Sequence, residues 1–379
     1  MSQALELTKA LIERRSVSPA DEGCQGLISA RLSALGFNIE ALRFGAVENL
    51  WARRGTGSPV VCFAGHTDVV PAGDERAWTR PPFGGEIADD ILYGRGAVDM
   101  KGAIACFLAA AFGYLGDGGQ KRGSLSFLIT GDEEAVGVNG TPKLLQWLKE
   151  RGETLDAAIV GEPTSAAAVG DEIKIGRRGY LNAKLTVHGK QGHSAYAERA
   201  DNPIPKLARM IDRISTVQLD NGTAHFQPSS LEATIISVPN SATNVIPGAA
   251  EANFNIRYND LFTRARLEAW VNDQLTAAAR EVSASFSLAF EGSGDVFLTK
   301  PGPLVETMAA AIEGVTKRRP SLTTNGGTSD ARFIKDFCPV VEAGLINATA
   351  HHVDEHVPIA DLETLTAIYR RFIEAYFSA

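Results

Sequence analysis

The first part of the chain alternates between short, nearly continuous apolar runs and longer stretches whose apolar residues recur at helical spacing. The short runs predict buried strands, and they lie at 60–65, 124–130 and 157–160. The helical stretches lie at 5–14, 24–35 and 103–114. Strands that alternate with helices are typical of an α/β protein with a parallel sheet, in which sites form beyond the carboxyl ends of the strands.

The pattern changes after residue 178. Strand-like alternation now occurs at 181–187, 231–238, 252–258 and 283–290, and helical spacing at 205–214 and 267–279. This order, strand-helix-strand-strand-helix-strand, is that of the ferredoxin-like split unit. The first pattern then returns with a helix at 304–315, a strand at 339–341 and a helix at 359–377. We therefore predict a domain of residues 1–178 and 292–379, with a mainly parallel sheet flanked by helices, and a ferredoxin-like α+β domain inserted at 179–291.

Composition narrows the class of protein. The chain has 379 residues, of which 44% are hydrophobic, as in a globular protein, and its formal net charge of −8 argues against a nucleic-acid surface. The longest apolar stretch, 103–115, is too short to span a membrane and is interrupted by Gly113. The N-terminus is typical of an amphipathic helix rather than an export signal, and the four cysteines form no Cys-x-x-Cys motif. These features predict a cytoplasmic protein with buried thiols.

A histidine and an acid end the first apolar run. Asp68 follows His66 by two residues in an extended segment, so both side chains point to the same side. Asp68 could hold one imidazole nitrogen of His66 and leave the other for a metal ion. The alternative is an ordinary pair of polar surface residues.

Further acids follow the other predicted strands or precede a helix. Asp99 comes before the helix at 103–114, Glu133 and Glu134 follow the second strand, and Glu162 follows the third. Taken singly, these acids are better explained as a helix N-terminal charge or solvated loop acids, and His351 and His352 as surface imidazoles. Several carboxylates at one sheet edge would repel one another without a divalent cation among them, and mixed His and carboxylate ligands suit zinc, cobalt or manganese.

Four stretches that contain these candidate residues resemble the dinuclear zinc aminoacylase and exopeptidase family. They are GHTDVVPAGD at 65–74, LYGRGAVDMKG at 92–102, GDEE at 131–134 and GEP at 161–163. The resemblance extends over nearly the whole chain and implies a metal-dependent hydrolase of linear amides with two Zn²⁺ per subunit, where Co²⁺ can substitute at one site. It also implies a cis peptide bond between Asp99 and Met100.

The resemblance assigns five metal ligands. His66 and Glu162 are expected to bind one zinc ion, Glu134 and His351 the other, and Asp99 to bridge the two. His351 is preferred to His352 because the family places a Glu four residues after the ligand, and Glu355 matches His351 in this respect.

Two further acids are expected to serve the reaction without binding metal. Glu133 is expected to act as the general base that takes a proton from the attacking water and passes it to the departing amine. Asp68 is expected to support the metal ligands.

A narrower resemblance concerns the substrate. The stretches GRRG at 176–179, GGTSDARF at 326–333 and INATAH at 346–351 are similar to the branch of the family that hydrolyses N-succinyl-LL-2,6-diaminopimelate to succinate and LL-2,6-diaminopimelate, in lysine and diaminopimelate biosynthesis. Arginine forks suit the carboxylates of such a substrate. The expected substrate-binding residues are Arg177, Arg178, Asn244, Arg257, Gly327, Thr328 and Asn347, with Arg332 as a further candidate.

The family also implies a homodimer formed through the inserted domain. His193 is then expected to reach the partner's active site and donate to the developing oxyanion, and Asn244 to arrive in the same way. Two other functions remain open: an acetylornithine deacetylase or dipeptidase of the same family, and a non-catalytic ligand-binding protein with this fold. The second is disfavoured because every ligand position and Glu133 are filled.

Overall fold

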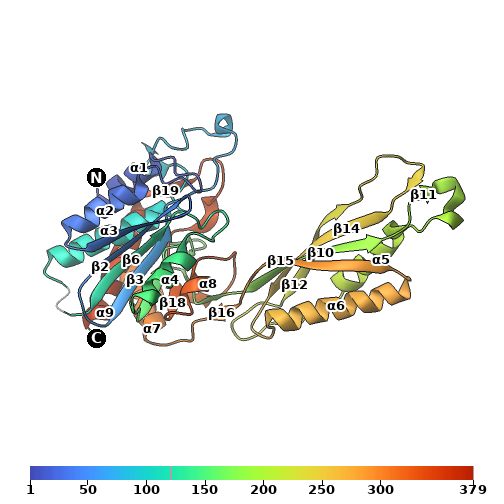
Figure 1. The fold of residues 1–379 in the computed structure, drawn as a ribbon. Helices are drawn as coiled ribbons and strands as arrows, with labels where there is room; N and C mark the ends of the chain where they lie inside the picture. Colours follow the sequence, from blue (N-terminus) through green and yellow to red (C-terminus); the bar gives the residue numbers. More distant parts are fainter. Residues whose placement is uncertain (120–121, 379) are drawn as a thin grey trace. The chain divides into compact units, whose positions relative to one another are not determined.

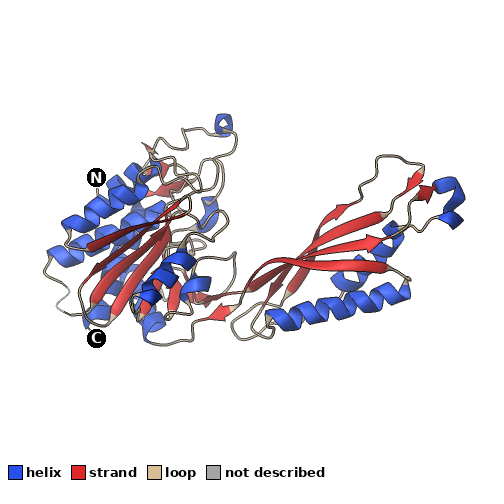
Figure 2. Ribbon diagram, in the orientation of Figure 1, coloured by secondary structure: helices blue, strands red, loops and turns tan. Residues whose placement is uncertain are grey.

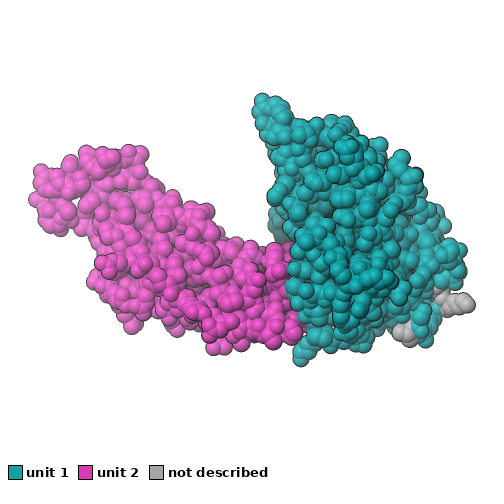
Figure 3. All heavy atoms as spheres, turned by 180° about the vertical axis from the view of Figure 1, so that it is seen from behind, with its two compact units in different colours: residues 1–175, 299–323, 329–379 teal, residues 176–298, 324–328 magenta. Residues whose placement is uncertain are grey.

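The computed structural model describes residues 1–119 and 122–378, and Figure 1 traces their path. Figure 2 shows how helices and strands are distributed along it. The chain divides into two compact units, coloured in Figure 3. Unit 1 comprises Met1–Ile175, Thr299–Thr323 and Ser329–Ala379, and unit 2 comprises Gly176–Leu298 and Thr324–Thr328. Unit 2 thus begins earlier and ends later than the predicted insert at 179–291, and it includes a short segment that we had placed in the first domain.

Unit 1 is built on a mixed sheet in the order β1-β2-β6-β3-β7-β18-β8-β17. Its strands are β1 (Asn38–Phe44), β2 (Val47–Arg54), β3 (Val60–His66), β6 (Ser124–Thr130), β7 (Ala157–Val160), β8 (Glu172–Lys174), β17 (Ser321–Thr323) and β18 (Val340–Glu342). The central strands β6, β3, β7 and β18 are parallel, whereas β1 and β2 form an antiparallel hairpin that adds to β6. The predicted mainly parallel sheet is confirmed. The carboxyl ends of its four central strands lie at the same edge.

Helices cover this sheet, and its central strands β3, β6, β7 and β18 are buried along their whole length. The helices of unit 1 are α1 (Gln3–Ile12), α2 (Cys24–Ala34), α3 (Lys101–Gly116), α4 (Thr141–Glu150), α7 (Pro303–Thr316), α8 (Ala331–Ile334) and α9 (Ile359–Ser378). Helix α3 packs against both α1 and α9 and is therefore buried on nearly every side. Phe107 of α3 stacks on Phe63 of β3 with ring centroids 4.5 Å apart, and Tyr369 of α9 lies 5.1 Å from Phe107. Each such aromatic pair adds roughly 0.5–1.5 kcal/mol beyond the area it buries.

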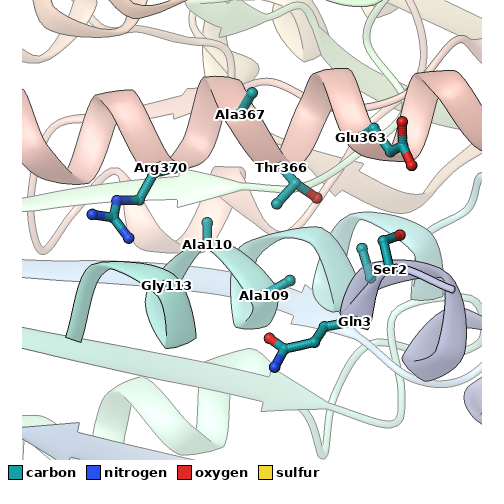
Figure 4. A pocket seen from close by; sticks show the side chains of 10 residues that line it. Ser2, Gln3, Ala109, Ala110, Gly113, Glu363, Thr366, Ala367 and Arg370 are labelled. Carbon is teal, nitrogen blue, oxygen red and sulfur yellow. The ribbon is translucent and has the colours of Figure 1, made fainter. Parts of the chain in front are cut away.

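A pocket of about 440 Å³ lies between α1, α3 and α9 (Figure 4). Gln3, Ala110 and Arg370 are among the residues that line it. Its described lining contains no residue that we predicted to bind metal or substrate.

Unit 2 contains a four-stranded antiparallel sheet in the order β12-β14-β10-β15. Its main elements in chain order are β10 (Gly179–His188), α5 (Pro203–Ser215), β12 (Ser230–Ser237), β14 (Ala249–Tyr258), α6 (Arg264–Glu281) and β15 (Ser285–Gly294). Alternate residues of β10 and β14 are buried, and they form one apolar core with residues of α5 and α6. The predicted ferredoxin-like order of strands and helices is confirmed.

Several regular elements of unit 1 were not predicted from the sequence, among them β1, β2 and α4. Strand β1 is exposed or half-buried along its whole length, so it carries no continuous apolar run. Helix α4 is short, and a glycine-rich loop precedes it. The cysteines agree with the prediction, since all four are free and buried. Among the described residues, no helix is both long and apolar enough to cross a membrane.

Candidate metal centre and catalytic residues

Unit 1 gathers acids and histidines at the carboxyl ends of its central strands. His66 is the last residue of β3, Glu133 and Glu134 lie just beyond β6, and Glu162 lies just beyond β7. Because these strands are parallel and adjacent, their ends meet at one edge. Asp99 joins them from the loop before α3.

Asp99 lies between two histidines, with one carboxylate oxygen toward each. Its Oδ1 is 3.3 Å from His66 Nε2, and its Oδ2 is 3.2 Å from His351 Nε2. Glu162 Oε1 lies 3.6 Å from His66 Nε2, and Glu134 Oε1 lies 2.8 Å from His351 Nε2. The structure thus brings the five predicted ligands into two groups that share Asp99.

The ligand atoms of this cluster are suited to a cation. His66 Nε2, Asp99 Oδ1 and Glu162 Oε1 are buried and have no hydrogen-bond partner among the described residues. Leaving a buried polar atom unsatisfied costs about 1–3 kcal/mol. One imidazole nitrogen and two carboxylate oxygens pointing at one another would be satisfied together by a divalent ion such as zinc. The residues therefore fit the metal that the sequence predicts.

The orientation of His66 differs from the sequence prediction. Its Nδ1 lies 2.9 Å from the main-chain oxygen of Asp68, whereas the Asp68 carboxylate is 3.7 Å away. The Asp68 carboxylate instead accepts from the main-chain N–H groups of Glu133 and Glu134, at 3.3 and 3.1 Å, and from the hydroxyl of Ser18. Asp68 thus fixes the turn that carries both glutamates. An Nδ1–H that donates to a carbonyl leaves the Nε2 lone pair of His66 for a metal.

The two histidines have raised pKa values because carboxylates surround them. Burial acts to lower the pKa of His66, but Asp99 and Glu162 outweigh it and raise that pKa well above its usual value. Hydrogen bonds with Asp99 and Glu134 raise the pKa of His351 to about 10. Metal binding requires neutral imidazoles, so loading the site would release protons.

The pKa values of the acids are shifted in different directions. For Asp99, burial acts to raise the pKa, but His351 and His66 outweigh it and hold the pKa below its usual range. Burial, followed by the charge of Asp99, raises the pKa of Glu162 to about 7. Burial, followed by the charge of Glu162, raises the pKa of Glu133 well above its usual value. A carboxyl group with a raised pKa is suited to holding and returning a proton.

Glu133 lies against the same group of ligands. Its Oε2 is 3.9 Å from His66 Nε2. Possible metal-ligand atoms of His66, Glu133 and Glu162 all lie within 4.8 Å of one another. The same holds for His66, Asp99 and Glu134. Distances alone would allow Glu133 as a ligand, so its role as a base stays a prediction.

Three of the predicted substrate arginines, Arg177, Arg178 and Arg257, belong to unit 2, whereas Arg332 belongs to unit 1. Arg257 lies with its guanidinium 5.5 Å from the ring centre of Tyr180, and the Nε of Arg178 is buried without a hydrogen-bond partner among the described residues. Burial, followed by the charge of Arg257, lowers the pKa of Arg178, so these two cations lie near each other. Arg177 donates to the main-chain oxygen of Asn325, 3.1 Å away, and so holds the loop that contains Gly327 and Thr328.

A two-stranded ribbon of unit 2 brings His193 and Asn244 together. It pairs β11 (Gly192–His193) with β13 (Val245–Ile246), and Ser194 N–H donates to the main-chain oxygen of Asn244 at 2.9 Å. His193 is exposed, and its Nδ1 accepts from the N–H of Ala195. Asn347, by contrast, belongs to unit 1, where its Nδ2 donates to the main-chain oxygen of Pro163, beside Glu162.

Arg95 and Glu355 form a buried ion pair that was not predicted from the sequence. The sequence analysis used Glu355 only to choose between two neighbouring histidines, and it did not single out Arg95. In the structure both are fully buried, and Arg95 Nη1 lies 2.7 Å from Glu355 Oε2. The spacing from His351 to Glu355 was a usable signal, but the partner of Glu355 is 260 residues away in the sequence.

Known proteins resemble this chain over its whole length. The profile of "Peptidase family M20/M25/M40" matches residues 62–375. The chain is 52% identical over 384 residues to a succinyl-diaminopimelate desuccinylase of Bradyrhizobium sp. (strain ORS 278), covering 100% of both chains. It is 53% identical over 379 residues to the protein of that name from Rhodospirillum centenum, covering 99% of this chain and 97% of the relative.

Solved structures show the same fold at low sequence identity. Aminopeptidase PepT from Bacillus cereus has a TM-score of 0.80 at 19% identity, with coverage of 100% of this chain and 98% of that one. An M20 family metallo-carboxypeptidase from Sulfolobus solfataricus has a TM-score of 0.78 at 18% identity, with full coverage of both chains.

Proposed function

Because this chain belongs to peptidase family M20/M25/M40, we propose that it is a metal-dependent amide hydrolase that converts N-succinyl-LL-2,6-diaminopimelate and water to succinate and LL-2,6-diaminopimelate. The full-length relatives at about 52% identity carry the corresponding name, and the family resemblance read from the sequence is confirmed. The observation that carries the chemistry is the carboxylate of Asp99, which lies between His66 Nε2 and His351 Nε2. The reaction belongs to lysine and diaminopimelate biosynthesis. The cytoplasmic location stays a prediction.

Two zinc ions are the proposed metals, with cobalt able to replace one of them. His66, Glu162 and Asp99 would hold one ion, and His351, Glu134 and Asp99 the other. Bound there, the ions would polarise the amide carbonyl and lower the pKa of the attacking water. The buried, unpartnered ligand atoms of His66, Asp99 and Glu162 support this assignment.

Glu133 supplies the proton transfer in this proposal. Its carboxylate takes the proton of the attacking water and returns it to the nitrogen of the departing amine, which therefore leaves as a neutral group. Two features support the role: the raised pKa of Glu133, caused first by burial, and the fixed turn in which Asp68 accepts from the Glu133 N–H.

Replacing His351 by Ala is expected to lower the metal content by one ion per chain, whereas His352→Ala should retain both ions. The reason is that His351 Nε2 lies 2.8 Å from Glu134 and 3.2 Å from Asp99, whereas the His352 imidazole has no such carboxylate contact among the described residues. Elemental analysis after dialysis against a weak chelator measures the difference. If the two variants showed the reverse pattern, the ligand would be misplaced by one residue.

The substrate assignment is tested with wild-type protein and the Arg178→Ala variant on a panel of N-acyl amino acids, by product analysis with added zinc. The wild type is expected to release succinate from the succinylated substrate and to turn over N-acetylornithine poorly. Arg178→Ala should raise KM for the succinylated substrate roughly tenfold or more, because an unpaired buried group costs about 1–3 kcal/mol. An equal loss on an acetylated substrate would assign Arg178 to stability or to the common amino-acid end, and good turnover of acetylornithine would support the deacetylase instead.

We also propose a homodimer formed through unit 2. Strand β12 lies at the edge of its sheet and exposes Ile235 and Ile236, at 55% and 64%. An exposed apolar edge strand is a surface on which a second chain can pair. A dimer would also give the exposed His193 a site to serve in the partner chain.

A further inference from the structure

Glu355 is a fully buried carboxylate whose hydrogen bonds all end on one loop. Its Oε2 accepts from Arg95 Nη1 at 2.7 Å and from the N–H of Gly96 at 3.0 Å. Its Oε1 accepts from the N–H groups of Val98 at 2.9 Å and Asp99 at 3.2 Å. The loop before α3 thus wraps around this carboxylate, and Gly96 adopts a φ of 87°, a conformation that favours glycine.

Arg95 connects the same carboxylate to the loop that carries His351. Besides Glu355, its Nη2 donates to the main-chain oxygens of His351 at 3.3 Å and Pro71 at 3.4 Å. Its guanidinium also lies 5.3 Å from the ring centre of Trp78. His351 has a φ of 63°, which a residue with a side chain rarely adopts, so its backbone must be held by its surroundings.

The two loops meet again at the strands that flank them. β5 (Ile91–Tyr93) pairs with β19 (His356–Pro358), and the N–H of Gly94 donates to the main-chain oxygen of Glu355. The ion pair of Arg95 and Glu355 therefore lies between the main chains of Asp99 and His351, whose side chains meet at 3.2 Å.

We propose that Glu355 and Arg95 are positioning residues for the metal centre: they fix the main chain of Asp99 relative to that of His351, so that one carboxylate can serve both ions. This inference rests on the proposed two-ion centre. Neither side chain touches substrate or metal in this role. Residues that support metal ligands from outside typically change metal affinity by roughly 10–100-fold when they are replaced.

Two variants test the contributions of Glu355 and Arg95 separately. Glu355→Gln keeps the size of the side chain but turns an NH₂ group toward N–H donors, so it should displace Asp99 and weaken both ions by roughly 10–100-fold. Arg95→Lys keeps the charge beside Glu355 but cannot also donate to the His351 carbonyl, so it should weaken mainly the ion held by His351 and Glu134. Arg95→Lys also serves if Glu355→Gln does not fold.

The measurement is a competition between the protein and a chromophoric chelator for Zn²⁺, supported by the visible absorption spectrum of the Co²⁺-loaded protein. Arg53→Lys and Glu153→Gln are the matched controls, because this ion pair joins Ser124 at the opposite end of β6 from Glu133. The controls should lower thermal stability without changing Zn²⁺ affinity or the Co²⁺ spectrum.

Folded variants that bind two Zn²⁺ with wild-type affinity would overturn the positioning role. A loss of affinity matched by the controls would also overturn it, since it would then follow from stability alone. A wild-type chain that binds fewer than two Zn²⁺ would instead contradict the proposed two-ion centre, so the two failures are distinguishable.

Discussion

Glu133→Gln is expected to reduce turnover by roughly 10²–10⁴-fold, the usual contribution of a general acid-base group, while leaving the metal content unchanged. Glutamine has nearly the same size but cannot take a proton from water, and its main-chain N–H can still donate to Asp68. Steady-state rates on the succinylated substrate, together with elemental analysis of the same sample, measure both effects.

Glu134→Gln provides the matched control, because it alters the neighbouring residue of the same turn. Glu134 lies 2.8 Å from His351 Nε2, so its variant should lose metal as well as activity. A Glu133→Gln protein with wild-type turnover would remove Glu133 from the reaction. A Glu133→Gln protein that had lost one metal ion would make Glu133 a ligand.

His193→Ala is expected to reduce kcat by about 10²–10³-fold, the usual cost of losing an oxyanion donor. The residue belongs to unit 2, and its exposed imidazole uses Nδ1 to accept from Ala195, which leaves the other nitrogen free to donate. If it acts in the partner's site, mixing His193→Ala with Glu133→Gln should restore activity. Random exchange of subunits should restore roughly a quarter of the wild-type activity, because half of the dimers are mixed and each then holds one complete site.

Two controls make this complementation decisive. Mass spectrometry of intact dimers verifies that subunits have exchanged, and a mixture of two separately prepared Glu133→Gln samples should stay inactive. Exchange without recovery of activity would mean that His193 acts within its own chain or takes no part in catalysis. A monomeric wild-type protein in the same experiment would contradict the proposed dimer.

Much of the site follows from the sequence because its geometry is a property of parallel sheets. His66, Glu133, Glu134 and Glu162 come directly after apolar runs, and adjacent parallel strands bring such ends to one edge whatever the details of packing. The preference for His351 over His352 rested on the spacing to Glu355 that the family resemblance implies. The order of strands and helices in unit 2 followed from its alternating pattern, since burial on one face leaves that period in the sequence.

Other features depend on contacts between distant segments, which leave no period or local motif. The partner of His66 is the main-chain oxygen of Asp68 rather than its carboxylate, because the turn after β6 offers two N–H groups to that carboxylate. The segment Thr324–Thr328 joins unit 2 although the residues on either side belong to unit 1. Arg95 and Glu355, separated by 260 residues, become an ion pair only when two loops close on each other. A sequence specifies which groups each strand end presents, but only the folded chain decides which hydrogen-bond donor reaches which acceptor, since every buried polar group must find its partner in space.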